Sequence, residues 1–405
     1  MNPTNYNLSV SHPRPSANEK KISLLGKTFT IATDCDAHFF GFEELAQLSG
    51  QWKSFFLNSP DRCIYHGSHY LEFASRENGF AGILGIEKEG EPFVAIPIHP
   101  KRGNSFTTGY SGILFAPLTT EKQLRKRIDV LEEFLFLNSN FNIEIIQSAQ
   151  AVSYKDGDRR NMLSALLAEI PNLKIQNCYS RVVDLSSYEF SQSICDLDVS
   201  VNKDVEKLLQ SFEGEVRSQV RKALRSGLQL NFFDLSVEVQ RNQYFEGFIP
   251  VHEESWERTG MHPHTRSYLE GLSLAVINSG GRDLGVTVNF NAEVVAAVNV
   301  HVFGGNSLYW SGCSSDLGKS MNGNPLALLG GMIAARHYGA EMFEIGRFSP
   351  SEKSLKERAI TAYKAQFGGV VIPIFKGEKI SSRQIFIRNA RQLIAKLLRT
   401  MKPKN

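Results

Sequence analysis

The pattern of apolar and polar positions predicts helices and strands that alternate along the first half of the chain. Paired apolar runs around the charged turn EKEGEP predict a β-hairpin over 80–100. Apolar residues at helical spacing predict helices at 42–58, 120–140 and 159–170. Shorter apolar runs predict strands at 27–34, 111–118, 141–149 and 174–186. The first half is therefore expected to combine α-helices with mixed β-structure.

The second half repeats this order of elements. Its hairpin is expected over 283–304, with Asn291 in the turn, and another strand follows at 307–315. Helical spacing predicts helices at 204–212, 216–227, 239–260, 265–278, 324–340 and 354–369. Apolar runs predict strands at 228–235, 342–347 and 370–375. Asn324 is the expected cap of the helix that starts there, with Pro325 at its first position.

The repeated order predicts an α+β fold made of two tandem domains, each a mixed sheet flanked by helices. The boundary is expected near 184–200, which is rich in Ser and Asp and lacks periodicity. The predicted parts are a disordered lead-in at 1–27, an N-terminal domain at 28–190, a C-terminal domain at 191–380 and a basic helix at 381–405.

Composition limits the classes of protein that need to be considered. At 405 residues the chain is too long for one ordinary core, and its 42% hydrophobic and 21% charged residues are typical of a globular protein. The net charge of +3 gives no argument for DNA binding. The five cysteines form no CxxC motif, so neither a zinc site nor a redox pair is indicated. No apolar run reaches the roughly 20 residues of a membrane span. We expect a cytoplasmic protein without a transmembrane segment.

Five motifs occur in the second half in a specific order. They are VRSQVRKALRSGLQL, HEESWERTG, YWSGCSS, NPLALLGGMIAARHYGAEMFEIG and YKAQFGG. In this order and spacing they resemble the FemAB-type acyl- and aminoacyltransferases. The resemblance implies two tandem GNAT-like domains, with the catalytic cleft on the side of the C-terminal domain. The N-terminal half matches only in its order of elements.

The chain departs from the family pattern at three places. The strand that often ends in an acidic residue and a glycine pair ends here in Glu344, Ile345, Gly346 and Arg347, so an arginine replaces the second glycine. The long coiled-coil insertion of some tRNA-dependent members is absent. The phosphate-binding loop of ordinary acetyltransferases is not evident, although the Gly- and Ser-rich segment 314–325 occupies its place. These departures affect the identity of the substrate more than the fold.

The resemblance implies a catalytic role for Lys364 and Tyr363, because the aromatic-lysine pair of the family lies by the donor carbonyl. Acyl transfer to an amine forms a tetrahedral oxyanion, which an ammonium can stabilise, and it releases a proton. Glu344 and Tyr309, on neighbouring predicted strands, are the candidates for moving that proton. The alternative is that Lys364 is a solvated side chain, favoured at a helix C-terminus by the helix dipole.

The basic helix is the candidate phosphate site. Arg217, Arg221 and Arg225 recur every four residues and therefore share one face, and guanidinium groups match phosphate oxygens well. We expect Arg217 and Arg221 to face a cleft. The alternative is a solvated amphipathic face. Trp256, Trp310 and Arg347 complete the predicted substrate-binding set.

Nucleophilic and metal-dependent chemistry find little support. Three histidines, His252, His262 and His264, lie close together, but their spacing matches no metal-binding helix motif. No GxSxG motif is present, and no cysteine lies in a nucleophile signature. We expect direct transfer without a covalent enzyme intermediate, with no metal and no resident cofactor.

The sequence therefore predicts an acyltransferase that moves an acyl or aminoacyl group onto an amine of a cell-envelope or polysaccharide precursor. An acyl thioester such as acyl-CoA is the favoured donor, and acyl carrier protein or aminoacyl-tRNA is the other potential partner. The expected acceptor is a phosphorylated small molecule or a lipid-linked precursor. One alternative is a tRNA-dependent aminoacyltransferase acting on a peptidoglycan precursor. The other is a non-catalytic protein that binds a phosphorylated ligand.

Overall fold

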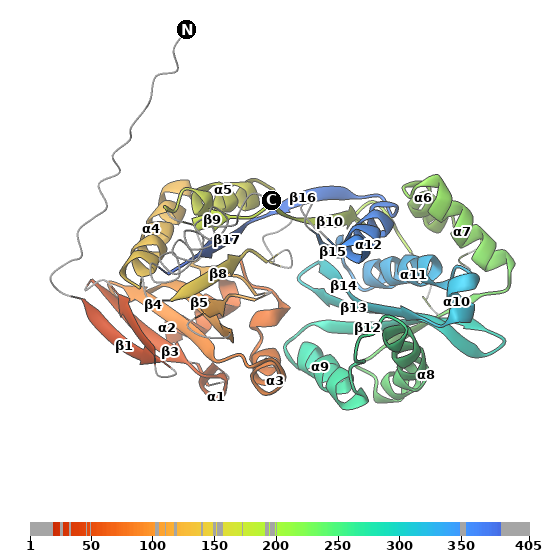
Figure 1. The fold of residues 1–405 in the computed structure, drawn as a ribbon, viewed down its shortest axis with the longest axis horizontal. Coiled ribbons are helices and arrows are strands. Elements are labelled where there is room, and N and C mark those ends of the chain that lie inside the picture. The colour runs from red at the N-terminus through yellow and green to blue at the C-terminus, as the bar shows by residue number, and fades with distance from the viewer. Residues whose placement is uncertain are drawn as a thin grey trace, which may run out of the picture.

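Two large mixed β-sheets lie side by side in the computed structural model, and helices cover the faces of both (Figure 1). The structure describes residues 19–381, except for short gaps at 25–26, 32–33, 46, 49, 102–104, 110, 117–119, 139–140, 149–150, 152–156, 172, 191–193, 195–198, 200 and 349–353. The predicted fold class, with mixed sheets flanked by helices, is confirmed.

The elements of the first half agree with most of the predicted ranges. Its strands are β1 (Lys20–Leu24), β2 (Lys27–Ile31), β3 (Cys35–Phe40), β4 (Gly82–Lys88), β5 (Glu91–Lys101), β6 (Ser105–Thr107), β7 (Leu114–Phe115), β8 (Asn142–Ile146), β9 (Leu173–Ile175) and β10 (Cys178–Asp184). Its helices are α1 (Phe42–Leu45), α2 (Gly50–Asn58), the 3-10 turn η1 (Ile64–His66), α3 (Ser68–Asn78), α4 (Glu121–Leu137) and α5 (Gly157–Ala168).

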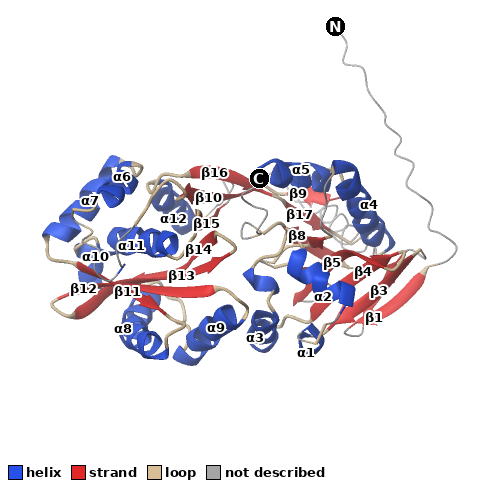
Figure 2. Ribbon diagram, turned by 180° about the vertical axis from the view of Figure 1, so that it is seen from behind, coloured by secondary structure: helices blue, strands red, loops and turns tan. Residues whose placement is uncertain are grey.

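The second half follows its predicted order closely. Its helices are α6 (Lys203–Gln210), α7 (Gly214–Arg225), α8 (Glu238–Glu257), α9 (Arg266–Asn278), α10 (Asp316–Ser320), α11 (Gly323–His337) and α12 (Leu355–Ala365). Its strands are β11 (Gln229–Asp234), β12 (Arg282–Phe290), β13 (Glu293–Phe303), β14 (Asn306–Ser314), β15 (Met342–Phe348), β16 (Val370–Ile374) and β17 (Lys376–Lys379). Figure 2 shows both halves from behind.

The two sheets have matching strand orders, which supports the expected pseudo-repeat. The first sheet runs β3-β4-β5-β6-β8-β17-β9, with β7 paired to β5, and the second runs β11-β12-β13-β14-β15-β10-β16. In each path the fourth and fifth strands are parallel, β6 with β8 and β14 with β15. The pairs on either side of them are antiparallel. The parallel pair therefore occupies the same place in both sheets.

The sixth strand of each sheet comes from the other half of the chain. Strand β10 enters the second sheet between β15 and β16, although it precedes the predicted boundary. Strand β17, near the end of the described chain, enters the first sheet between β8 and β9. The domain bounds at 190 and 191 stay a prediction. Each sheet takes one strand from beyond these bounds, β10 in the second sheet and β17 in the first. The two halves are thus joined reciprocally.

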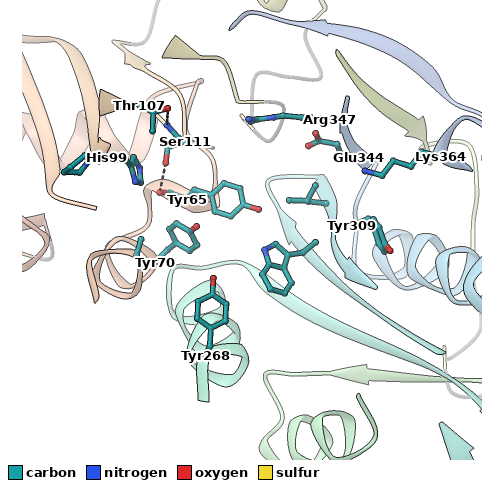
Figure 3. Close-up of a pocket in the computed structure, with 16 residues that line it drawn as sticks. Tyr65, Tyr70, His99, Thr107, Ser111, Tyr268, Tyr309, Glu344, Arg347 and Lys364 are labelled. Carbon is teal, nitrogen blue, oxygen red and sulfur yellow. Dashed lines mark hydrogen bonds between the residues drawn. The ribbon is translucent and has the colours of Figure 1, made fainter. Parts of the chain in front are cut away.

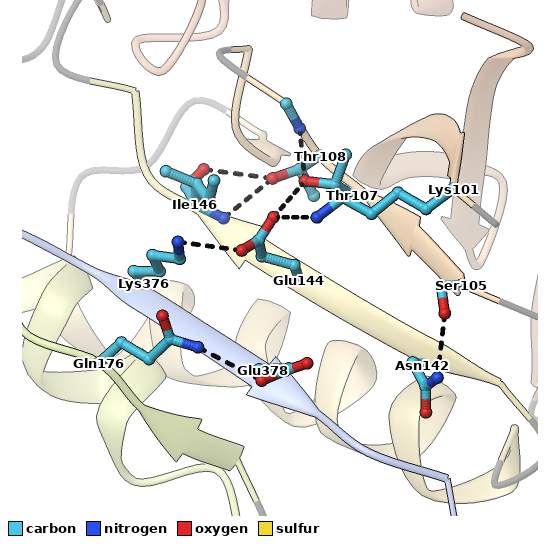
Figure 4. A network of polar contacts seen from close by, with 11 residues as sticks. Lys101, Ser105, Thr107, Thr108, Asn142, Glu144, Ile146, Gln176, Lys376 and Glu378 are labelled. Atoms are coloured by element: carbon cyan, nitrogen blue, oxygen red, sulfur yellow. Dashed lines mark hydrogen bonds and ion pairs between the residues drawn. The ribbon is translucent and has the colours of Figure 1, made fainter. Parts of the chain in front are cut away.

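A polar network fixes β17 in the first sheet (Figure 4). Glu144 on β8 accepts from Lys376 on β17 at 3.0 Å and from Lys101 on β5 at 2.6 Å. The hydroxyl of Thr107 on β6 donates to the same carboxylate at 3.1 Å. These lysines hold the pKa of Glu144 below its usual value even though burial opposes them. The carboxylate thus connects three neighbouring strands with β17.

Three expectations about individual elements need correction or lie outside the structure. Lys20–Leu24 was expected in a disordered lead-in but forms β1, because it pairs with β2 and Ile22 packs on the first core. The cap of α11 is Asn322 rather than Asn324, whose side chain instead donates to Ser314 at 3.0 Å. The predicted basic helix at 381–405 lies outside the described residues from 382 onwards.

Helix α3 has no counterpart among the predicted elements. It packs against α9 of the second half, so tertiary contacts stabilise a segment whose own pattern is weak. Among the described residues, no helix has the length and apolar character needed to cross a membrane.

Candidate functional site

A cavity of about 530 Å³ lies where the two halves meet (Figure 3). Its polar and aromatic lining from the first half consists of Tyr65, Tyr70, His99, Thr107 and Ser111. The second half contributes Tyr268, Tyr309, Trp310, Glu344, Arg347 and Lys364. The cavity adjoins the point where β14 and β15 separate, since the two strands pair only from Asn306–Met342 to Leu308–Glu344. Beyond that point Tyr309 and Trp310 of β14 and Gly346 and Arg347 of β15 line the cavity.

Close packing between the halves forms one wall of the cavity. A Cβ atom at Gly67 would lie 2.2 Å from Cβ of Ser279, so only glycine allows this approach. The backbone N–H of Tyr70 donates to the Ser279 hydroxyl at 2.9 Å. Cys63 and Ile64 of the first half share an apolar cluster with α9. These contacts fix η1 and α3 against α9.

A β-bulge in β14 places Tyr309 between two cavities. Asn299 pairs with Ser311 and Val300 with Tyr309, so Trp310 is the additional residue. Tyr309 lines the large cavity and also a smaller one of about 240 Å³. Its hydroxyl packs where a Cβ at Gly312 would lie, and burial raises its pKa. One aromatic side chain thus forms part of the wall of both spaces.

The smaller cavity lies between β14, α8, α10, α11 and α12. Its basic lining residues are Arg258 and Lys319, and Asn324 of the first turn of α11 also lines it. Tyr363 faces this cavity, and burial raises the pKa of its phenol. The adjacent residues Tyr363 and Lys364 therefore contribute to different cavities.

A second bulge, in β15, sets the direction of Glu344. Val182 pairs with Glu344 and Arg181 with Gly346, so Ile345 is the additional residue. Glu344 is only 4% exposed and accepts a hydrogen bond of 2.6 Å from the hydroxyl of Ser180. Ser180 lies on β10, so the strand that crosses from the first half holds this carboxylate in place.

Lys364 lies in the last turn of α12, half-buried at the cavity. Gly346 has a left-handed φ of +121°, and a Cβ there would lie 2.6 Å from Nζ of Lys364. The glycine therefore makes room for the ammonium beside β15. Figure 3 shows the Lys364 side chain pointing towards Glu344. Lys364 therefore lines the cavity between the halves together with Tyr309 and Glu344, while its catalytic role stays a prediction.

The predicted phosphate helix lies elsewhere. Arg221 on α7 is exposed and pairs with Glu206 at 2.6 Å. Arg217 donates to the backbone carbonyls of Gln210 and Phe212, at 3.0 and 2.7 Å. Arg225 is exposed, and none of the three arginines lines the cavities described above. The expectation that Arg217 and Arg221 face a cleft is wrong, because Arg221 binds Glu206 within α6 and Arg217 binds carbonyls at its C-terminal end.

Trp256 does not line the large cavity but supports its wall. Its ring lies 4.8 Å from that of His264, which stacks on Tyr268 at 4.5 Å. The backbone N–H of His264 donates to Nε2 of the buried His252 at 3.1 Å. The imidazoles are therefore part of the packing behind Tyr268. Within the described part of the chain, no three potential ligands cluster in a way that could hold a metal ion.

Sequence reasoning missed the contribution of the first half. Tyr65, Tyr70, His99 and Ser111 belong to no motif of the resemblance, which covers only the C-terminal half. Ser111 donates to the backbone carbonyl of Tyr65 at 3.2 Å and so supports the aromatic wall. The one signal was the concentration of polar and aromatic residues at 61–70, between two predicted elements.

Buried histidines near the cavity predict a loss of stability in mild acid. Burial, with a smaller contribution from Arg62, lowers the pKa of His66 to about 3. Below its ordinary pKa of about 6.5 the unfolded chain binds a proton at this position and the folded chain does not. The free energy of unfolding should therefore decrease as the pH is lowered, and at pH 5 this histidine should account for a loss of about 2 kcal/mol relative to neutral pH.

Urea unfolding of the wild type and of His66→Gln at pH 7.5, 6 and 5 measures this contribution. The comparison is needed because Asp283 acts in the opposite sense. Burial raises its pKa to about 7, so its stabilising contribution declines as the pH rises. His69→Gln, at an exposed position on α3, is the matched control. Equal pH slopes for wild type and His66→Gln would show that His66 is not responsible.

Comparison with known proteins gives similarity only among solved structures. No family model matches the chain, and no curated protein sequence matches it. The crystal structure of FemX superposes with a TM-score of 0.53 at 14% identity, covering 87% of this chain and 98% of FemX. The structure of L-PGS from Bacillus licheniformis gives a TM-score of 0.48 at 13% identity, covering 82% and 91%.

A tandem GNAT protein from the clavulanic acid biosynthesis pathway gives a TM-score of 0.46 at 11% identity, covering 85% of this chain and 98% of its own. At these identities the likeness concerns the fold. It spans both halves, including the N-terminal half, for which the sequence offered only an order of elements. The chain therefore has the two-part fold of FemX, as the motifs of its second half predicted.

Proposed function

We propose that this protein is a transferase that moves an acyl or aminoacyl group from an activated donor to an amine of a cell-envelope or polysaccharide precursor. The observation that carries the proposal is that two cavities share Tyr309 as a wall. A two-substrate transfer needs a donor and an acceptor that approach one point from different sides. Glu344 and Lys364 lie on the side of the larger cavity, which we assign to the acceptor.

The chemistry needs two groups at that point. The amine nitrogen attacks the donor carbonyl, a C–N bond forms, and the C–S or C–O bond to the leaving group breaks. The carbonyl oxygen becomes negative in the transition state, and the Lys364 ammonium stabilises it. Glu344 accepts the proton that the nitrogen loses and returns it to the departing thiolate or alkoxide, so that the carboxylate is regenerated. No bond to the enzyme forms.

The smaller cavity is assigned to the donor. Lys319 lines it, and an ammonium suits the phosphates of coenzyme A or of a tRNA end, whereas Arg258 beside it is paired with Asp316 at 2.7 Å. The narrow volume of about 240 Å³ favours an extended thioester arm over a bulkier donor. An acyl thioester is therefore preferred, with acyl carrier protein or aminoacyl-tRNA as the alternative carrier. The protein holds no resident cofactor in this proposal.

Calorimetric titration with acetyl-CoA, a longer acyl-CoA and charged tRNA tests the donor, followed by a thiol-release assay with an amine acceptor. We expect acyl-CoA to bind and amine-dependent release of coenzyme A to follow. Lys319→Ala should weaken donor binding by about tenfold, since one charge-assisted phosphate contact is lost. Lys356→Ala, at an exposed position on α12, is the control.

The other outcomes are equally informative. Binding and transfer only with charged tRNA would support the tRNA-dependent peptidoglycan-precursor aminoacyltransferase. Binding of a phosphorylated ligand without transfer to any amine would support the non-catalytic alternative. Binding of none of these donors would refute the assignment of the smaller cavity.

A further inference from the structure

Arg347 reaches the large cavity because of the bulge in β15. In a regular strand, residues 344 and 347 point to opposite faces. The additional residue at Ile345 changes that alternation, and both Glu344 and Arg347 line the cavity. Without the bulge, Glu344 would be the charged residue of β15 at the cavity. The bulge therefore adds the guanidinium of Arg347 to the site.

The guanidinium extends away from the reacting groups. Figure 3 shows it pointing from β15 towards Ser111 and Thr107 of the first half, whereas Lys364 points to Glu344. Burial raises the pKa of Cys63 to about 11, and the positive charge of Arg347 opposes that rise. Cys63 belongs to the first half, so the positive charge of Arg347 lies close to that half.

The charged lining has an excess of positive charge. Arg347 and Lys364 are cations, and Glu344 is the carboxylate among the described lining residues. His99 adds no charge near neutral pH, because burial lowers its pKa to about 4. The remaining wall is largely aromatic, and a wall of this kind strengthens charge interactions by excluding water. A negatively charged group on the acceptor would balance the site.

We infer that the acceptor amine belongs to a molecule that also carries an oxyanion, a carboxylate or a phosphate, and that Arg347 binds that oxyanion. A guanidinium binds both groups through two parallel hydrogen bonds. The inference rests on the proposed function, since it concerns the acceptor of that reaction. The half-buried Tyr70 and Tyr268 provide aromatic rings that suit a sugar ring between the amine and the oxyanion.

Calorimetric titration without donor tests the inference. The probes are glucosamine, glucosamine 6-phosphate and 2-amino-2-deoxyglucuronic acid, with inorganic phosphate as a fourth. In the wild type, the phosphate- or carboxylate-bearing sugar should bind about tenfold or more tightly than glucosamine. Arg347→Gln should remove that difference, and Arg347→Lys should restore part of it. The better of the two charged sugars identifies the oxyanion.

The matched control is Arg358→Gln, at an exposed position on α12, which should behave as wild type. In a turnover assay, Arg347→Gln should raise KM for the charged acceptor about tenfold with kcat nearly unchanged, since this contact is made in ground and transition states alike. Equal binding of charged and neutral sugars by the wild type would overturn the inference. So would an advantage that persists in Arg347→Gln, or an absence of Arg347-dependent binding of all four probes. Because the titration needs no donor, an inactive donor assay does not affect this result.

Discussion

Lys364→Met is expected to lower kcat by roughly 10² to 10³, because one preorganised donor to the oxyanion is lost. KM should change little, since the interaction is made mainly in the transition state. Methionine keeps the apolar stem beside Gly346, and Lys364 is only half-buried, so the free energy of unfolding should be nearly unaffected. Steady-state kinetics with the donor identified by titration, together with urea unfolding, measure both quantities.

Lys356→Met is the matched control for this change. Lys356 lies on the same helix, two turns earlier, and is exposed. It should retain wild-type turnover, which would exclude a general effect of removing a lysine from α12. Full turnover by Lys364→Met would show that the ammonium is a solvated helix-end charge.

Glu344→Gln is expected to lower kcat by roughly 10² to 10⁴, the usual contribution of a positioned general base. The amide has the shape of the carboxylate and its oxygen still accepts the hydrogen bond from Ser180, so the local packing should persist. It cannot accept the proton of the attacking amine. Kinetics at several pH values measure the loss, and Glu357→Gln, exposed on α12, is the control.

Ser180→Ala separates the role of the Glu344 carboxylate from that of the Ser180 hydroxyl that orients it. Removing the 2.6 Å hydrogen bond leaves Glu344 charged but less well oriented. We expect a kcat between that of the wild type and that of Glu344→Gln. If Glu344→Gln retained wild-type activity, another group would have to take the proton, and Tyr309 would be the next candidate.

Apolar patterns that extend over long segments predicted the elements of the fold well. The second hairpin is formed by β12 and β13, and the strongly apolar helix near 324–340 is α11. The exchange of strands was not predicted, because β17 has only four residues, three of them charged, and carries no apolar alternation. Strand pairing across about 230 residues depends on which sheet has an open place, and local patterns do not contain that information.

For the site, the sequence identified individual residues but not the backbone features that place them. Tyr309, Trp310, Glu344, Arg347 and Lys364 surround one cavity, and all five were named from the sequence. Two bulges, each of one additional residue, place the four strand residues there, and bulges leave little trace in a sequence. The arginines of α7 were misplaced because a face of one charge does not reveal whether its partner is a ligand or a neighbouring carbonyl.

The exchange of β17 has a consequence for the order of synthesis. Strand β8 is made about 230 residues before the strand that pairs with it, since Ile146 pairs with Lys376. At about 5 to 20 residues per second, a ribosome needs roughly 10 to 50 seconds for that stretch. During this interval the edges of β8 and β9 that later bind β17 have no partner from that strand, and such edges are prone to pair with other chains. Translation that stops before Lys376 therefore leaves a defect in the half that was made first.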